Sequence, residues 1–249
     1  MTIKSAASLP IICADWPAPT NVRTAVTTRS GGYSVAAYAE LNLAMHVEDN
    51  PASVVQNRRA LLTELKLPAE PVWLEQVHGV AVVDAAQTKN FCADAAFTTE
   101  KNIVCTVLTA DCLPVLMCNR AGNKVAAAHA GWRGLHAGVI EAAIAALNEP
   151  AENILLWLGP AIGPNAFEVG DEVRTAFISD LPAAIAAFRV SKPGHWFADI
   201  YQLARLRLAR IGVHQIYGGS LCTYSDAQRF YSYRRDGKTG RMASLIWME

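Results

Sequence analysis

The sequence has no excess of charge of either sign, because 22 lysines and arginines are balanced by 22 aspartates and glutamates. Nucleic-acid binding depends on a basic face that releases counterions, and the arginines here are dispersed or locally clustered rather than aligned in a stripe. We therefore expect no nucleic-acid partner. Hydrophobic residues make up 52% of the chain and charged residues 18%, which is typical of a globular protein with an ample apolar core.

Long apolar runs are also missing. The most apolar window, residues 103–118, is interrupted by threonine, aspartate and proline well before it reaches membrane-spanning length. The apolar patch near the start, residues 9–13, is too short for the core of a signal peptide. We therefore expect a cytoplasmic protein with no membrane partner. In that reducing compartment the six scattered cysteines are expected to stay free thiols.

No glycine- or serine-rich linker, charge block, low-complexity tract or repeat divides the sequence, so we predict a single domain over residues 1–249. One helix is predicted from Asn50 and Pro51 to Pro68, and another from Asp199 to Gly212. Strands are predicted at 72–78, 103–110, 124–130 and 154–159, with a closing hairpin over 231–247 that turns at 236–240. Strands outnumber helices and often follow one another directly, which favours an α+β fold with mixed β-sheets flanked by helices.

Three segments place a residue with metal affinity at the end of an apolar strand, directly before a glycine or proline turn. They carry His78 in "EQVHG", Cys112 in "TADCLP" and His129 in "AAAHAGWRG". Two imidazoles and one thiolate are a plausible ligand set for zinc, whose catalytic sites use three protein ligands and one open position. Taken singly, each residue also has a structural interpretation, as a hydrogen-bonded histidine or a buried thiol. Their spacing matches no short metal motif, so the residues alone leave both interpretations open.

Five motifs, in order, resemble the YfiH family, which is also called the laccase-domain or polyphenol-oxidase family and, in bacteria, the peptidoglycan editing factor. The resemblance extends from about residue 27 to the C-terminus. The motifs are "PVWLEQVHG", "TADCLPVLMCNRAG", "VAAAHAGWRGL", "WLGPAIGPNAFEVG" and "YSYRRDGKTGRMASLIW".

This resemblance implies a CNF/YfiH-like α+β fold, of the kind shared with cysteine hydrolases and bacterial toxin deamidase domains. It also implies a zinc ion held by His78, Cys112 and His129, which then act as catalytic residues too. The implied activity is phosphorolysis of adenosine, inosine, guanosine and methylthioadenosine, together with deamination of adenosine. The expected partners are therefore small nucleosides and phosphate, and we expect the protein to be a monomer.

Phosphorolysis requires a group that positions phosphate, and the planar fork of arginine pairs with two phosphate oxygens at once. Arg133, four residues beyond His129, is the first candidate for this catalytic and substrate-binding role. Arg29 precedes two glycines whose amides could also hold an anion. Arg235 belongs, with Arg234 and Arg241, to a cluster of like charges that needs an anionic neighbour, either protein carboxylates or substrate.

Deamination additionally requires a carboxylate that moves a proton. Asp111 is a catalytic candidate beside Cys112, although neighbours on a regular strand point to opposite faces unless the strand turns there. Asp111 could equally orient His78 or His129 through a hydrogen bond. Glu75 and Glu168 are the alternatives, and the sequence does not choose among the three.

Three other functions remain open from the sequence. A copper-dependent polyphenol oxidoreductase could use the same ligands with Met117 as a weak axial ligand, but a full multicopper centre needs more than the six histidines present. A metal-free hydrolase, such as one that edits peptidoglycan precursors, could use Cys112 as nucleophile and His129 as base. Outside enzymology, the metal could be purely structural or the protein could be an interaction module. A structural zinc site would need a fourth protein ligand, and no residue matches that pattern.

Overall fold

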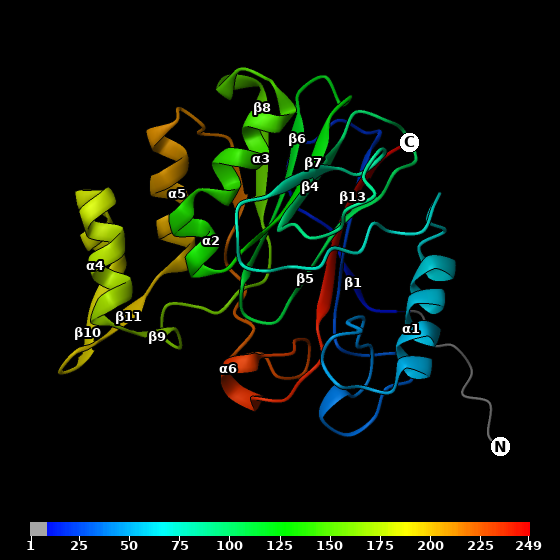
Figure 1. Cartoon of the computed structure of the whole chain (residues 1–249), viewed down its shortest axis with the longest axis horizontal. Coiled ribbons are helices and arrows are strands. Elements are labelled where there is room, and N and C mark those ends of the chain that lie inside the picture. Colours follow the sequence, from blue (N-terminus) through cyan, green and yellow to red (C-terminus); the bar gives the residue numbers. More distant parts are fainter. Residues whose placement is uncertain (1–8) are drawn as a thin grey trace.

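Two β-sheets packed face to face form the centre of the fold, and helices cover their outer faces (Figure 1). The computed structural model describes residues 9–249. Residues 1–8, part of the stretch interpreted above against a signal peptide, lie outside the described residues. Among residues 9–249, no helix combines the length and the apolar character that crossing a bilayer would take.

The larger sheet is mixed and has six strands, of which only β12–β8 and β3–β4 pair in parallel. In spatial order its strands are β12 (Ile216–Gly218), β8 (Ile154–Leu158), β6 (Leu113–Asn119), β7 (Val125–Ala130), β4 (Ala95–Thr98) and β3 (Val82–Asp84). Because both faces of this sheet are covered, its central strands are apolar throughout, and every residue of β6, β7 and β8 is buried.

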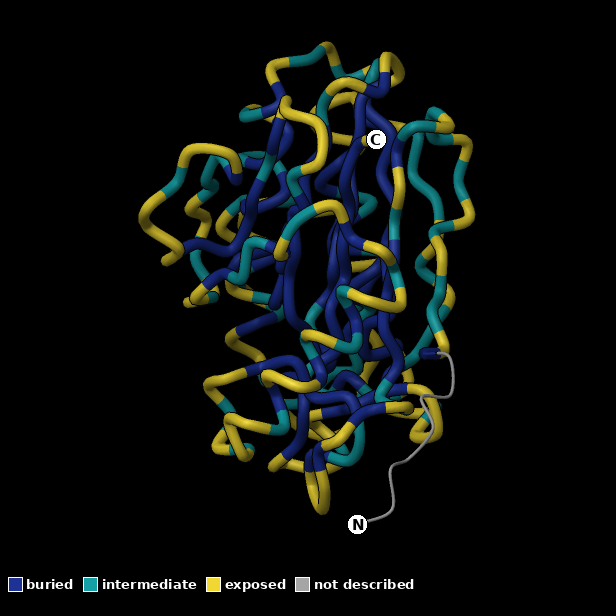
Figure 2. The backbone as a smooth tube through the Cα atoms, turned by 90° about the vertical axis from the view of Figure 1, so that its right-hand side faces the viewer, coloured by how far each residue is buried: buried dark blue, intermediate teal, exposed yellow. Residues whose placement is uncertain are grey.

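The second sheet has four strands and packs against the first. Its order is β1 (Ile11–Ile12), β2 (Val22–Thr27), β13 (Met242–Met248) and β5 (Cys105–Thr109), all antiparallel. A third, three-stranded sheet consists of β10 (Phe188–Lys192), β11 (His195–Ala198) and β9 (Glu168–Gly170). Figure 2 shows the buried chain concentrated in the central strands, with exposed segments at the turns.

Helices complete an αββα arrangement of layers. The six-stranded sheet shares its core with α2 (Trp132–Ala137), α3 (Val139–Leu147), α4 (Asp171–Asp180) and α5 (Ile200–Arg210), whereas α1 (Pro51–Glu64) packs on the far face of the four-stranded sheet. The remaining helical segments are α6 (Tyr233–Asp236) and three short 3-10 helices at Ala36–Tyr38, Ala151–Asn153 and Pro182–Ala187.

The sequence-based prediction of an α+β fold with mixed sheets is confirmed. Both predicted helix starts are also confirmed, because the Asn50 side chain accepts a hydrogen bond from the Ala52 amide and Asp199 accepts one from the Gln202 amide. Gly212 follows α5 with a φ of 78°, a conformation that glycine adopts without strain.

Two of the predicted elements are wrong. Residues 72–78 form isolated bridges at Val72 and Glu75 instead of a strand, because the Gln76 side chain bonds both backbone groups of Leu108 and takes the place of a strand partner. The closing hairpin is also absent. Residues Tyr233–Asp236 form the short helix α6, and β13 pairs with β2 and β5, which come from distant parts of the chain.

Candidate metal centre

The side chains of His78, Cys112 and His129 meet at one point of the structure. Their potential ligand atoms all lie within 4.8 Å of one another, and the Sγ of Cys112 is 3.9 Å from the Nε2 of His78. The two imidazole rings are 4.7 Å apart between centroids and nearly perpendicular, with an interplanar angle of 79°. The three strand-end residues singled out in the sequence are therefore brought together by the fold.

Each of the three side chains is presented by a different backbone feature. His78 lies in a turn with a φ of 62°, Cys112 occupies the junction between β5 and β6, and His129 is the last residue but one of β7. Asp111, just before the cysteine, has a φ of 89°, so the strand turns there. This turn allows Asp111 and Cys112 to line the same cavity, which a regular strand would not. Gly131 follows β7, and a Cβ there would lie 2.8 Å from the His78 ring and 3.0 Å from the Cys112 sulfur.

A fully buried carboxylate, Asp94, holds the two histidines in place. Its Oδ1 lies 2.8 Å from the Nδ1 of His129 and accepts a hydrogen bond of 2.9 Å from the amide of His78. Its Oδ2 accepts bonds from the amides of Val77, at 3.2 Å, and Gly79, at 2.6 Å. With Nδ1 bound to Asp94, the Nε2 of His129 is directed to the cluster, the arrangement in which an outer carboxylate orients a metal-binding imidazole.

The sequence analysis missed Asp94. The residue directly precedes β4, and the antiparallel register pairs Ala95 with Ala128, so that Asp94 lies opposite His129 and their backbones bond at 2.7 Å. The sequence does show that Asp94 is a polar residue directly before an apolar strand, and this pattern could have marked it as a candidate. Its importance depends on the β4–β7 register, which the sequence does not specify.

The charges of the cluster are strongly coupled. Burial raises the pKa of the Cys112 thiol, but the His129 and His78 imidazoles outweigh it and lower that pKa to about 6. Burial likewise lowers the pKa of His129, but the Cys112 thiolate and Asp94 outweigh it and raise that pKa to about 9. Without a metal, the pair is therefore a thiolate and an imidazolium at neutral pH.

The donor set fits a first-row transition metal. A tetrahedral ion at the usual bond lengths holds its nitrogen and sulfur ligands roughly 3.5 Å apart. The ligand atoms here are 3.9 Å apart between Cys112 and His78 and at most 4.8 Å apart overall, so they would move only slightly closer to bind such an ion. A thiolate already deprotonated at neutral pH is ready to bind such an ion. These three residues therefore form a candidate metal site.

The cluster opens into a cavity of about 510 Å³, a size typical of small-molecule sites. The cavity is bordered by the ends of β5 and β7, by the first residues of α2 and by α6, so its lining comes from segments far apart in the chain. It is lined by His46, Gln76, His78, Leu108, Thr109, Ala110, Asp111, Cys112, His129, Trp132, Arg133, Ile162, Phe167, Ile200, Tyr233, Arg234 and Arg241.

Asp111 is the one carboxylate among these lining residues, and three donors bond to it. It accepts hydrogen bonds from the hydroxyls of Thr223, at 2.6 Å, and Ser232, at 3.0 Å, and from the amide of Arg234, at 2.6 Å. Asp111 therefore ties the C-terminal loop to the metal cluster instead of orienting His78 or His129, a role that Asp94 performs. The alternative carboxylates Glu75 and Glu168 do not line the cavity.

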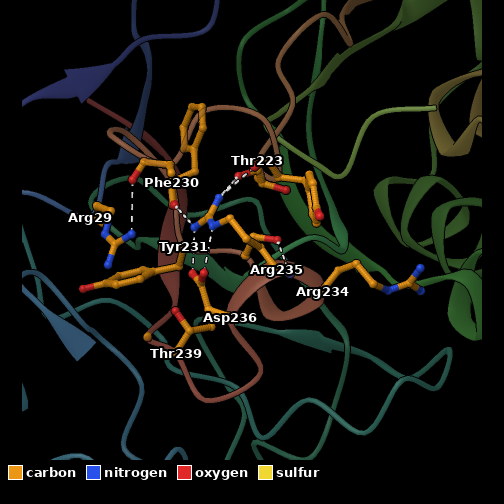
Figure 3. Close-up of polar contacts among 12 residues, drawn as sticks. Arg29, Thr223, Phe230, Tyr231, Arg234, Arg235, Asp236 and Thr239 are labelled. Carbon is orange, nitrogen blue, oxygen red and sulfur yellow. Dashed lines mark hydrogen bonds and ion pairs between the residues drawn. The ribbon is translucent and has the colours of Figure 1, made fainter. Parts of the chain in front are cut away.

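The arginines predicted to bind substrate differ in position. Arg133 lines the cavity, with its guanidinium 4.5 Å from the Trp132 ring. Arg29 and Arg235 are not lining residues, and Figure 3 shows both among the residues whose polar contacts surround Tyr231 and Asp236. Arg29 donates to the carbonyls of Ala39 and Ala227. Arg235 pairs with Asp236 and donates to the carbonyls of Thr223, Tyr224 and Phe230.

The positions of Met117 and of the histidines bear on copper chemistry. Met117 is buried in the core five residues along β6 from Cys112, roughly 16 Å in an extended strand, so it cannot be an axial ligand of the cluster. Of the six histidines, only His46, His78 and His129 line the cavity. A full multicopper centre therefore lacks the imidazoles it would need.

The layers and the cluster define a class of protein: an αββα fold with a nitrogen-and-sulfur metal site at the edge of its paired sheets. Residues 23–249 match the family described as multi-copper polyphenol oxidoreductase laccase. The chain belongs to this laccase-like, or YfiH, family, as its five motifs indicated.

Three relatives illustrate how far the likeness extends. "Purine nucleoside phosphorylase PA4543" of Pseudomonas aeruginosa is 56% identical over 94% of this chain and 97% of that protein. "Purine nucleoside phosphorylase YfiH" of Escherichia coli is 53% identical over 96% of this chain and 98% of that protein. The crystal structure of protein NMB0706 of Neisseria meningitidis superimposes with a TM-score of 0.93 and 50% identity, covering 96% of this chain and 99% of that one.

Proposed function

We propose that this protein is a metal-dependent purine nucleoside phosphorylase that acts on adenosine, inosine, guanosine and methylthioadenosine. One observation carries the proposal most strongly: the His78–Cys112–His129 cluster opens on a cavity that also contains arginines. Relatives with more than half of their residues in common are named for this activity. The cavity volume of about 510 Å³ can hold a nucleoside together with phosphate.

Zinc is the metal we propose, because the cluster supplies three nitrogen and sulfur ligands and leaves one side to the cavity. When bound, it would supply Lewis acidity at the point where the cavity meets the cluster. The ligand atoms would be the Nε2 of His78, the Sγ of Cys112 and the Nε2 of His129. Copper is the alternative, since nitrogen and sulfur donors also suit that metal.

The reaction replaces one bond to the sugar by another. An oxygen of hydrogen phosphate bonds to C1′ of the ribose, and the bond from C1′ to the purine nitrogen breaks. The purine leaves with the bonding electrons and takes up the proton that the phosphate carried, which yields free base and ribose-1-phosphate. Positively charged side chains favour this step because they bind and orient the anionic nucleophile, and Arg133 provides such a charge beside the cluster.

We extend the proposal to deamination of adenosine, which exchanges the exocyclic amino group for an oxygen from water and releases ammonia. A carboxylate is required to move protons, and Asp111 is the carboxylate that the cavity lining offers. Since three donors already bond to Asp111, we expect deamination to be slower than phosphorolysis.

A hydrolase that uses Cys112 as nucleophile and His129 as base is the second candidate. The thiol pKa of about 6 favours it, because the nucleophilic thiolate predominates at neutral pH when no metal is bound. Editing of peptidoglycan precursors would be a reaction of this class. The metal separates the two candidates, since the hydrolase should keep full activity after the metal is removed.

The direct test is to incubate purified protein of measured metal content with adenosine and phosphate, and to quantify adenine, inosine and ribose-1-phosphate. We expect adenine to be the main base and inosine a minor product, with ribose-1-phosphate equal to adenine plus any hypoxanthine released from that inosine. Removal of the metal should abolish all three products, and zinc should restore them. Full turnover by the metal-free protein would contradict the metal dependence, and absence of adenine and ribose-1-phosphate with the metal-loaded protein would contradict the phosphorylase and leave the cysteine hydrolase.

A further inference from the structure

Three guanidinium groups line the metal cavity without a carboxylate partner. They belong to Arg133, Arg234 and Arg241, and within residues 9–249 none of them forms an ion pair with an aspartate or glutamate. Asp111, the one carboxylate of the lining, accepts the Thr223 and Ser232 hydroxyls and the backbone amide of Arg234 instead. The cavity lining therefore carries three guanidinium groups against a single carboxylate, that of Asp111.

Each of these guanidinium groups keeps donors available. Within residues 9–249 the Arg133 guanidinium forms no hydrogen bond, and it stacks on the Trp132 ring at 4.5 Å. Arg234 uses one terminal nitrogen, which donates to the Glu168 carbonyl, and Figure 3 shows its side chain extending away from the Arg235–Asp236 pair. Arg241 uses one terminal nitrogen for the carbonyls of Thr239 and Gly240.

The three guanidinium groups differ in exposure, since Arg133 and Arg234 are exposed whereas Arg241 is partly buried. Arg241 is only partly accessible, and burial lowers its pKa even though the negative groups of Cys112 and Asp111 favour its charge. Arginine donors arranged around a cavity match the several oxygens of a phosphate group, because each guanidinium can pair with two of them. Stacking on Trp132 also fixes Arg133 before a ligand arrives, which reduces the ordering cost of binding.

We infer that Arg133, Arg234 and Arg241 form a phosphate subsite of the metal cavity, separate from the residues that hold the metal. The subsite rests on the proposed function for its role in the reaction, because the phosphate bound there would be the nucleophile that attacks C1′. Arg29 and Arg235 have no part in it, since both use their guanidinium groups to hold backbone carbonyls. The subsite would hold the phosphate, and the remaining volume of the cavity would hold the nucleoside.

The first test compares Arg133→Gln with a matched control. Arg174→Gln removes an arginine that likewise stacks on a tryptophan, at 4.1 Å from the Trp196 ring, but does not line the cavity. We expect Arg133→Gln to raise the KM for phosphate at least about tenfold and to leave the KM for adenosine within about twofold. Metal content should be unchanged in both variants, and the control should match the wild type. An unchanged KM for phosphate, or an equal rise for adenosine, would overturn the inference.

The second test measures binding without turnover, by titrating inorganic phosphate into the metal-loaded protein and following the ³¹P resonance. Wild-type protein and Arg174→Gln should bind phosphate, whereas Arg133→Gln should bind it at least about tenfold more weakly. Phosphate binding of this pattern in a protein that shows no phosphorolysis would keep the subsite and reject the proposed function. Absence of phosphate binding by the wild type would reject the subsite itself.

A nucleotide could also bring a phosphate group to these arginines. Adenosine monophosphate distinguishes the two sources when it competes with inorganic phosphate in the same titration. We expect it to bind no more tightly than adenosine and phosphate do separately, because the subsite is proposed for the free ion. Tighter binding that Arg133→Gln removes would instead show a site for a nucleotide, and the assignment to free phosphate would be wrong.

Discussion

The two ends of strand β6 carry cysteines of opposite chemistry. Cys112 precedes the first residue of the strand and lies beside two imidazoles, which lower its pKa to about 6. Cys118 lies six residues further on, between β7 and β8, where burial raises its pKa to about 12. Cys118 is buried, whereas Cys112 is partly exposed and lines the cavity. The difference shows that neighbouring imidazoles and access to a cavity suit one thiol to be a ligand, while burial among apolar strands leaves the other a small apolar group.

The largest expected effect in this comparison is chemical. In metal-free protein at pH 7, a pKa of about 6 makes Cys112 mostly thiolate, whereas a pKa of about 12 leaves Cys118 a thiolate in only about one molecule in 100,000. We expect iodoacetamide to alkylate Cys112 and to spare Cys118 until the protein unfolds. Peptide mass mapping would measure both.

The sign of the pH dependence follows from the lowered pKa of Cys112. Protonation removes the thiolate on the acid side, so alkylation should fall as pH drops through about 6 and stay level above it. Added zinc should protect the residue. A rate that still rose tenfold per pH unit between pH 7 and 8 would mean that Cys112 is an ordinary thiol.

Substitution at the two positions should separate function from stability. Cys112→Ala removes a metal ligand, and we expect loss of bound metal and of phosphorolysis by more than the roughly 100-fold that loss of an outer partner costs. Cys118→Ala should keep metal and activity but lower the free energy of unfolding by about 1 kcal/mol, because it leaves a small void in the core. Metal analysis, turnover and denaturant titration would measure these effects. Wild-type turnover by Cys112→Ala would contradict the assignment of this thiol.

A smaller effect is expected from the carboxylate behind the histidines. Asp94→Asn should weaken metal binding by roughly 10- to 100-fold, since His129 loses the charged acceptor of its Nδ1 proton. A competition titration against a zinc chelator would measure the change. Asp84→Asn is the matched control, because Asp84 bonds the amide of Ala86 in a turn and contacts neither imidazole. Equal affinities for both variants would show that Asp94 only stabilises the turn.

The smallest effect tests how closely the backbone approaches the cluster. Gly131→Ala would place a methyl group 2.8 Å from the His78 ring and 3.0 Å from the Cys112 sulfur, and should weaken metal binding on the order of tenfold. Gly79→Ala is the control beside the same site, where the nearest atoms are 3.5 Å and 3.6 Å away. The same competition titration applies. Equal metal affinity in both variants would mean that the cluster adjusts to the added methyl group.

The motifs around His78, Cys112 and His129 predicted the candidate metal ligands, and the apolar strands predicted an α+β fold. Local signals sufficed for these features, because a strand's apolar pattern and a cap residue act within a few positions of the chain. The segment at 72–78 shows the limit. Its residues suit a strand, yet the Gln76 side chain replaces the strand pairing, and nothing local to the segment indicates this.

Which arginines line the cavity depends on contacts between distant segments of the chain. Arg234 and Arg241 were recognised only as part of a charge cluster, and Arg235 was preferred to both as a substrate-binding residue. The structure shows that Asp236 and three carbonyls hold Arg235, while its neighbours line the cavity. Which arginine of this cluster can bind a ligand depends on how the C-terminal loop runs past the cavity. The hydrogen bond from the Arg234 amide to Asp111 helps to fix that course.

The sequence by itself determined which residue types were present for the chemistry and which strands and helices would carry them. Only the tertiary structure decided that Asp94 bonds to His129, that Met117 is a core residue and that three arginines with no ion pair within residues 9–249 line the cavity. The physical reason is that residue type decides which side chains can bind a metal, and the local apolar pattern decides which segments form strands or helices. The distances between side chains depend on strand register and on the course of the loops. Both metal binding and charge compensation act only over a few ångströms.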